Sequence, residues 1–231
     1  PRLVFPTIIG NPKFKGSFIG EKTPDFYAGN NALSKYGILN IINPIELGNI
    51  NNFDGIEKLW DYTFTEELHI NPTEHPILLT ESIKTSQTER EKIMEIILEK
   101  FQFPSFYLCN QSQLSIYSTG KSTGISVDIG HELTQVVPII DNKINYESAK
   151  FFEFGGIDIS KFLLKSLNEK GNPISLDYGL LLASEIKEKK CYVAIDYEQE
   201  TKSKKCFEYE TEDGGQIKIE DECFICPELI F

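Results

Sequence analysis

The sequence lacks the features of a membrane-spanning or secreted chain. No apolar run in it approaches the ~20 residues that a membrane-spanning helix needs, and the mixed residues of its start do not form the basic-then-apolar pattern of a secretory signal,. We therefore expect neither a membrane span nor export.

Positive charge is scarce. Lys and Arg number 23 against 35 Asp and Glu, which gives a formal net charge of −12 at pH 7. Nucleic acid and anionic membranes would be repelled before any specific contact formed, so both are excluded as expected partners. Protein surfaces that carry positive charge remain suitable partners.

Cysteine and histidine are also sparse. The five cysteines are odd in number and have no framework spacing, which is typical of reduced thiols in a cytosolic setting,. Cys223 and Cys226 form a C-x-x-C, but no second pair and no suitably spaced histidine completes a zinc site. We expect both side chains to be small buried residues at the end of a strand.

The chain is long enough to bury a core in one large domain or two lobes, with 231 residues of which 40% are hydrophobic,. Residues 77–80 form a continuous apolar run, typical of a strand buried on both faces. Thr88 and Glu91 have the spacing of a capping box before an apolar helical stripe. A short strand at 106–109 follows. Strand, helix and strand in this order predict a parallel crossover and an α/β fold.

Other elements follow from periodicity and turn signals. Helices are predicted from Asn52, which can cap, and at 157–170 and 177–190. The predicted strands lie at 3–9, 38–42, 147–154, 192–197, 206–209 and 216–219. Residues 13–25 have loop composition, and residues 198–205 are charged and expected to be solvated.

Two runs rich in β-branched residues, 124–128 and 133–140, predict a β-hairpin. Asp128 ends the first run, and Gly130 lies in the turn. Such a turn can hold phosphate oxygens on backbone N–H groups while the carboxylate holds a hydrated divalent cation. An ordinary turn without a ligand is the alternative.

A second possible anion site lies at Gly155 and Gly156, between a strand and a helix with Asp158 in its first turn. Free amide groups at such a helix start favour an anion. A tight strand-to-helix turn explains the same residues equally well.

Several runs together resemble actin and the actin-related proteins, in one order along the whole chain. The central segment from Gln111 to Gly124 carries the resemblance first. The other runs are 1–6, 34–39, 75–81, 127–130, 137–139, 186–194 and 226–228.

The resemblance implies an actin-like α/β fold. This fold is ribonuclease H-like, belongs to the superfamily of actin, sugar kinases and chaperone ATPases, and has two lobes around a nucleotide cleft. Residues 1–118 would form the first half, with a small filament-contact subdomain at about 7–43. Residues 119–231 would form the second half, divided into part of a third subdomain at 119–154 and a fourth at 155–231.

Against the family, the chain lacks an opening segment and the last third, so we expect a fold that is incomplete at both ends. In the family, the loop that corresponds to 13–25 inserts into a neighbouring filament subunit. Phe18 and Ile19 would then be contact residues, and local packing is the alternative.

The resemblance also implies ATP or ADP with Mg²⁺ as cofactor and assigns residues to it. Gln111 matches the residue that orients the attacking water, and Asp128 the carboxylate that holds the metal through water. Gly130 and Thr134 lie in the second phosphate loop. Gly156 matches the glycine beside the ribose, where Asp158 is also a candidate, and Lys187 and Glu188 match the pair that lines the purine and ribose pocket.

The sequence departs from the family in the second phosphate loop. Ile129 replaces a serine that would contact a phosphate, and Glu132 brings a negative charge where the family has glycine. Gln135 stands where the family has a histidine near the attacking water, and we count it with Gln111 as a candidate catalytic residue. We therefore expect weakened or absent ATP binding and at most a slow ATPase activity.

The function expected from the resemblance is that of a divergent cytoskeletal protein in the cytoplasm. Its partners would be actin or actin-like subunits and actin-binding proteins. The alternatives are a functional, polymerising actin-type ATPase, an actin-related subunit of a larger complex, and a sugar kinase or chaperone-type ATPase.

Overall fold

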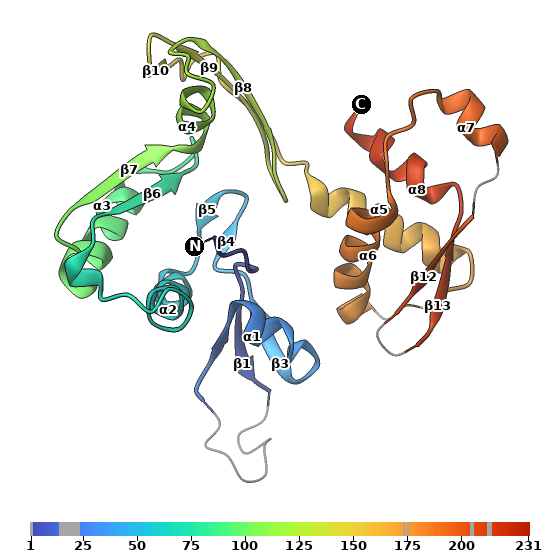
Figure 1. Cartoon of the computed structure of the whole chain (residues 1–231), viewed down its shortest axis with the longest axis horizontal. Coiled ribbons are helices and arrows are strands. Elements are labelled where there is room, and N and C mark those ends of the chain that lie inside the picture. Colours follow the sequence, from blue (N-terminus) through green and yellow to red (C-terminus); the bar gives the residue numbers. More distant parts are fainter. Residues whose placement is uncertain (1, 14–23, 173, 175, 204–205, 212–213) are drawn as a thin grey trace. The chain divides into compact units, whose positions relative to one another are not determined.

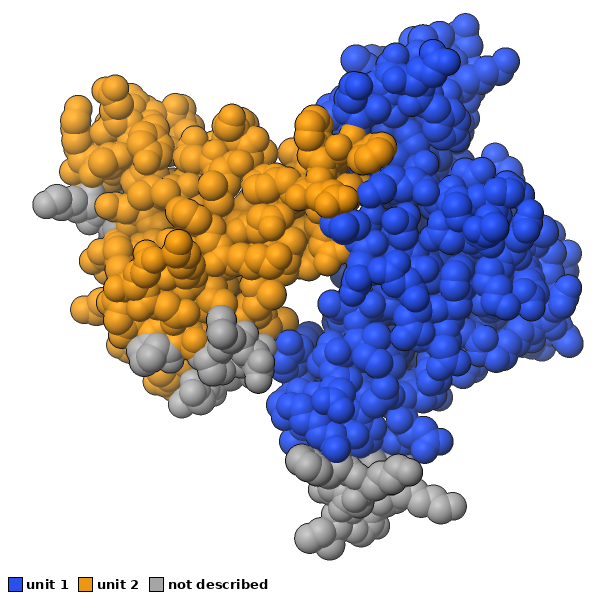
Figure 2. All heavy atoms as spheres, turned by 180° about the vertical axis from the view of Figure 1, so that it is seen from behind, with its two compact units in different colours: residues 1–128, 135–150 blue, residues 129–134, 151–231 orange. Residues whose placement is uncertain are grey.

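A computed structural model of the chain describes residues 2–13, 24–172, 174, 176–203, 206–211 and 214–231. The chain forms two compact units (Figures 1 and 2). Unit 1 comprises Pro1–Asp128 and Gln135–Lys150, and unit 2 comprises Ile129–Thr134 and Phe151–Phe231. These units are defined by contacts alone, so the functional halves at 1–118 and 119–231 stay a prediction.

Unit 1 opens with a small antiparallel sheet of β1 (Ile9–Pro12), β2 (Tyr27–Ala28) and β3 (Leu39–Ile42), in the order β2-β1-β3. The helix α1 (Gly29–Leu33) follows β2. The prediction of β3 is confirmed, but a strand at 3–9 is wrong. The ladder runs from Ile9 to Pro12, because β3 pairs with every residue of that stretch. Phe18 and Ile19 of the predicted filament-contact loop lie outside the described residues.

The helix α2 (Phe53–Tyr62) begins where it was predicted, after the hairpin of β4 (Ile45–Glu46) and β5 (Asn49–Ile50). The Asn52 side chain accepts a hydrogen bond from the Gly55 amide at 2.9 Å, which caps the helix,. Trp60 is partly buried and packs against two core clusters, one beneath β1 and one beneath the next sheet.

The predicted crossover is confirmed: β6 (Ile77–Glu81) and β7 (Phe106–Asn110) are parallel, with α3 (Gln87–Glu95) between them. A π-helical turn, Ile96–Lys100, extends α3. Burial on both faces is wrong for β6, since Leu78 is 53% exposed. Ile77 and Leu79, on the opposite face from Leu78, pack against the core cluster that contains Ile93 of α3.

The capping box of α3 lies two residues before the predicted one. The Ser86 side chain accepts from the Glu89 amide at 3.2 Å, and the Glu89 carboxylate accepts from the Ser86 amide at 2.8 Å. Both serine and threonine precede a glutamate at the required spacing in this segment. The structure uses the earlier pair, because the Glu89 carboxylate also accepts from the Ile50 amide at 3.2 Å.

A two-bond ion pair ties the end of β6 to α3. Arg90 donates from Nε and from a terminal nitrogen to the Glu81 carboxylate at 2.7 and 2.8 Å, and the Glu81 side chain is only 9% exposed. We expect Arg90→Met to lower the free energy of unfolding by about 2 kcal/mol, because it leaves a buried carboxylate without a partner. Urea denaturation of the variant measures this loss.

The exposed pair of Lys92 and Glu95 on the same helix is the control. Lys92→Met should cost less than about 1 kcal/mol. Equal losses for Arg90→Met and Lys92→Met would show that the partly buried pair of Arg90 and Glu81 stabilises the fold no more than an exposed pair does.

The helix α4 (Gln111–Tyr117) follows β7 and leads to the predicted hairpin of β8 (Gly124–Ile129) and β9 (Thr134–Ile140). The short strand β10 (Lys143–Ile144) pairs with β9, and β11 (Lys150–Phe152) is shorter than the predicted 147–154. Ile116 of α4 packs against Val137 and Ile139 of β9. One face of the hairpin is therefore covered by α4.

The core of unit 2 lies between the predicted helices, now α5 (Gly156–Glu169) and α6 (Leu176–Lys190). The predicted strands at 206–209 and 216–219 are confirmed as β12 (Phe207–Glu210) and β13 (Gln216–Ile219), which pair antiparallel, and α8 (Glu222–Ile225) follows them. A strand at 192–197 is wrong. The Tyr192 amide donates to Cys223 O at 2.9 Å, but residues 192–196 form no strand, and α7 (Tyr197–Ser203) begins at Tyr197.

Among the described helices, none combines the length and the apolar character that crossing a bilayer would require.

Candidate functional site

Asp128 and Gln135 meet across the β8–β9 hairpin in unit 1. Gln135 Nε2 donates to Asp128 Oδ2 at 3.2 Å. Gln135 is 5% exposed, and Asp128 is half-buried. A carboxylate accepts hydrogen bonds only, so this contact fixes which end of the glutamine amide faces Asp128. The structure thus brings together the predicted metal-binding carboxylate and one predicted catalytic residue.

Gln111, the other predicted catalytic residue, is the first residue of α4 and is exposed. The preceding Asn110 caps the helix, because its Oδ1 accepts from the Ser112 amide at 2.9 Å,. The cap holds the start of α4, and with it Gln111, at the carboxyl end of β7.

The turn of the hairpin and the two strand residues that flank it, Ile129–Thr134, belong to unit 2. The Gly130 amide donates to Leu133 O at 2.9 Å, and Thr134 Oγ1 donates to Phe154 O at 2.7 Å. Ile129 is 48% exposed and Glu132 is half-buried. The Gly130 amide and the Thr134 hydroxyl, both predicted to contact phosphate, therefore donate to carbonyl oxygens of unit 2.

The start of α5 is bonded to the same turn. The amides of Gly156 and Ile157 donate to the carbonyls of Gly130 and His131 at 2.9 and 2.8 Å. The Asp158 carboxylate accepts from the Gly155 amide at 3.0 Å. The expectation that these amides are free for an anion is corrected: the structure engages them in a tight turn, and Asp158 acts as a cap. A role of Asp158 toward a nucleotide stays a prediction.

Sequence reasoning missed the part that Gly155 plays in this contact. A Cβ on Gly155 would lie 2.6 Å from both Gly130 O and His131 O, which no side chain tolerates. The glycine pair was the available signal, but only the fold shows that its first member is needed for close packing against the turn.

Lys187 of α6 reaches the same region of unit 2. Its Nζ donates to Gly156 O at 2.8 Å, and burial lowers the pKa of this ammonium from its ordinary value, while the Glu188 charge acts in the opposite direction. Glu188 itself is exposed. The structure therefore brings Gly130, Gly156 and Lys187 together, and leaves Glu188 at the surface.

Two buried polar residues beside Gln111 were also missed. Asn110 and Ser112 are 3% and 1% exposed, and Asn110 Nδ2 and Ser112 Oγ have no hydrogen-bond partner within the described structure. Buried polar atoms without partners are uncommon and call for an explanation. The signal in the sequence was the polar run Asn110-Gln111-Ser112 directly after the predicted strand at 106–109.

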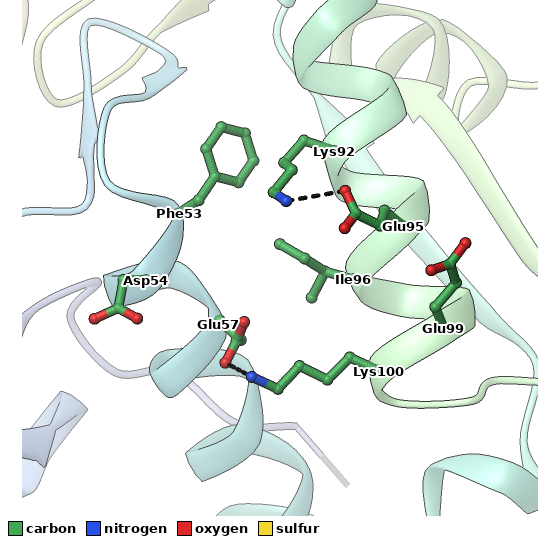
Figure 3. Close-up of a pocket in the computed structure, with 8 residues that line it drawn as sticks. All are labelled: Phe53, Asp54, Glu57, Lys92, Glu95, Ile96, Glu99 and Lys100. Carbon is green, nitrogen blue, oxygen red and sulfur yellow. Dashed lines mark hydrogen bonds and ion pairs between the residues drawn. The ribbon is translucent and has the colours of Figure 1, made fainter.

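A surface groove of about 430 Å³ lies between α2 and α3 and is separate from these residues (Figure 3). Phe53 and Ile96 are its only apolar lining residues. The others are Asp54, Glu57, Lys92, Glu95, Glu99 and Lys100. Lys100 pairs with Glu57 across the groove, and Lys92 with Glu95 along α3. Ligand pockets are mostly apolar, so this charged groove does not have the character of one.

The C-x-x-C residues fit their expected burial. Cys223 and Cys226 are buried free thiols, placed in α8 and in the 3-10 turn after it rather than at a strand end. Burial raises the pKa of the Cys226 thiol to about 12, so it stays protonated at neutral pH,. Over the described ranges, no group of three or more His, Cys, Asp or Glu side chains is arranged to hold a metal ion.

Comparison with known protein families gives a match over most of the chain. The family model described as Actin matches residues 1–178 of the 231-residue chain. The matched region includes the Gln111 segment, the β8–β9 hairpin and the start of α5. The chain therefore belongs to the actin family, whose actin-like ATPase fold agrees with the mixed α/β structure of the two units.

Proposed function

We propose that this chain is a divergent actin-like cytoskeletal protein that acts through contacts with protein partners and binds ATP more weakly than the family does. Its partners are actin or actin-like subunits and actin-binding proteins in the cytoplasm. The observation that carries the proposal is the negative side chain of Glu132 in the turn that follows Asp128.

The turn is poorly suited to phosphate for a further reason. Ile129, the last residue of β8 before the turn, is apolar, and the Gly130 amide already donates to Leu133 O at 2.9 Å. Phosphate binding in a turn depends on free backbone N–H groups and on the absence of negative charge. The apolar side chain of Ile129 and the negative charge of Glu132 both disfavour phosphate binding.

Asp128 is better suited to hold a cation than the turn is to bind a phosphate. A half-buried carboxylate whose orientation is fixed by Gln135 is suited to hold Mg²⁺ through water, since Mg²⁺ keeps several of its water ligands in proteins,. When bound, such an ion neutralises phosphate charge. Residues of this chain would contribute by orientation: Asp128 toward the hydrated ion and Gln111 toward a water.

The second candidate function, a slow actin-type ATPase that polymerises, is favoured by this same Asp128–Gln135 contact. In that case the Glu132 carboxylate would face solvent, and ATP would bind in spite of the turn. A third candidate, a non-filament subunit of a larger complex, agrees equally with family membership and a net charge of −12.

Isothermal titration of the chain with Mg-ATP separates the first two candidates. We expect no saturation at micromolar ATP, because the Glu132 charge opposes the phosphates. Binding at micromolar or lower concentration would contradict weakened ATP binding and favour the ATPase. Sedimentation in polymerising salt, run in parallel with and without actin, tests the partner assignment: the chain should pellet with actin even where it binds no ATP.

A further inference from the structure

The charged groove between α2 and α3 has walls that share one core within unit 1 (Figure 3). Phe53 of α2 packs against the cluster that contains Ile93 of α3 and Ile97 of the π-helical turn. Phe53 is half-buried, and Ile96, the other apolar lining residue, is 5% exposed. The shared core fixes both walls, so the groove of about 430 Å³ is preformed and has an apolar floor.

Negative charge exceeds positive charge along this groove. Four of its eight lining residues are acidic and two are basic, which leaves a formal charge of −2. Lys100 pairs with Glu57 across the groove. Lys92 pairs with Glu95 at 2.9 Å. Glu99 forms no ion pair among the described residues, so its exposed carboxylate is open to a positive group.

The acidic residues of α3 are spaced unfavourably for a helix by itself. Glu91, Glu95 and Glu99 follow one another at intervals of four residues, and all three are exposed. Like charges at this spacing destabilise a helix. Departures from local sequence rules are expected where a surface has a function. This row of charges therefore favours a positive partner outside the chain.

The wall formed by α3 also changes its helical form at the groove. The last three lining residues of this wall, Ile96, Glu99 and Lys100, belong to the π-helical turn Ile96–Lys100. Single π-helical turns are rare and are frequent at functional sites. The turn is thus a second feature, independent of charge, that marks the same surface.

The lining selects the chemistry of its occupant. Phosphate-containing ligands carry charge of the same sign as the lining and are repelled. Across the described ranges, no group of three or more His, Cys, Asp or Glu side chains is arranged to hold a metal ion. Arginine and lysine side chains suit the carboxylates, and an apolar side chain suits the floor, as in protein interfaces with an apolar centre and a polar rim.

We propose that the charged groove docks a short basic segment of a protein partner, with Arg or Lys side chains on Glu95 and Glu99 and one apolar side chain over Phe53 and Ile96. The inference rests on the proposed function only in taking the partner to be a protein, and it is independent of ATP affinity. A groove of about 430 Å³ admits a few side chains, so a single segment is its occupant. Residues spaced by four along a partner helix match the spacing of the acidic row.

The test measures binding of a fluorescent synthetic peptide to the full chain by fluorescence anisotropy at low ionic strength. The peptide has about 15 residues, long enough to form a helix when bound, with Arg at every fourth position and Leu beside each Arg. The natural chain should bind it, and a twin peptide with Glu in place of Arg should not bind. A second twin with Ser in place of Leu should bind more weakly, because it does not cover the apolar floor.

Two variants of the groove should change the affinity in opposite directions. Glu95→Gln with Glu99→Gln should raise the Kd by about threefold to thirtyfold, since two exposed ion pairs are lost. Lys92→Met should lower the Kd, because it removes a positive charge and leaves Glu95 without its present partner. Urea denaturation should show that the double variant is at least as stable as the natural chain, because like charges have been removed.

The matched control is Glu74→Gln with Glu147→Gln, which removes two exposed negative charges from unit 1 outside the groove lining. Its Kd should stay close to that of the natural chain. Equal weakening by the control and by the groove variant would overturn the proposal, because the peptide would then respond to total charge alone. A Kd that the groove variant leaves unchanged would overturn it as well. A chain that fails to pellet with actin, or that binds Mg-ATP tightly, contradicts the proposed function and changes neither outcome.

Discussion

Gly155→Ala is expected to lower the free energy of unfolding of unit 2 by about 3 kcal/mol or more, at the upper end of overpacking effects. The new Cβ would lie 2.6 Å from two backbone oxygens, Gly130 O and His131 O. Backbone atoms cannot turn away as a flexible side chain can. The turn must therefore separate from α5, which breaks the bonds from the Gly156 and Ile157 amides. Urea denaturation with a spectroscopic probe in unit 2 measures the loss.

The control is Gly37→Ala, because a Cβ at Gly37 meets no atom within 4 Å. Its effect should stay within about 1 kcal/mol and can be stabilising, since alanine reduces the freedom of the unfolded chain. If Gly155→Ala behaves like Gly37→Ala, the turn and α5 are not in close contact, and close packing is not what requires a glycine at this position.

The double variant Ile129→Ser with Glu132→Gly is expected to strengthen Mg-ATP binding by about tenfold to a thousandfold. Two unit charges ~4 Å apart interact by about 4 kcal/mol at an effective dielectric constant of 20, which is roughly a thousandfold in affinity. Exposure of the turn to solvent reduces this toward the lower figure. Isothermal titration of the natural chain and the variant under the same salt gives the ratio.

Glu99→Gln is the control for charge alone. Glu99 is an exposed residue on the charged groove of unit 1, and its change removes one negative charge from the chain without altering the turn. ATP affinity should not change in this variant. Equal affinities of the natural chain and the double variant would show that the turn is not what weakens binding, and the proposed function would lose its main support.

The elements with strong periodicity were predictable from sequence. The helix α2 carries apolar residues at three-and-four spacing after a capping asparagine, and α5 does so between a glycine pair and Gly171. In both, one amphipathic face and a defined start leave one way to bury the apolar side chains. The β6–α3–β7 crossover followed from the same local signals.

Predictions that depended on pairing were less successful. Residues 192–195 form a continuous apolar run like that of a strand but have no partner strand within the described chain. Gly10 to Pro12, which resemble a turn, are held in β1 by β3. The capping box of α3 was displaced by two residues because Ile50, distant in sequence, also donates to Glu89. In each case the outcome depends on whether a distant part of the chain supplies a partner.

The candidate site divides in the same way. Sequence alone was sufficient to identify the actin family, the hairpin, the carboxylate of Asp128 and the negative charge of Glu132, because these are properties of residue type and order. Only the folded chain shows that Gln135 bonds to Asp128 and that the amides at the start of α5 already donate to the turn. It also shows that Ser112 and Gln135 each have a buried oxygen without a hydrogen-bond partner among the described residues. Hydrogen bonds between distant residues depend on where the backbone places them, and a linear sequence does not contain that information.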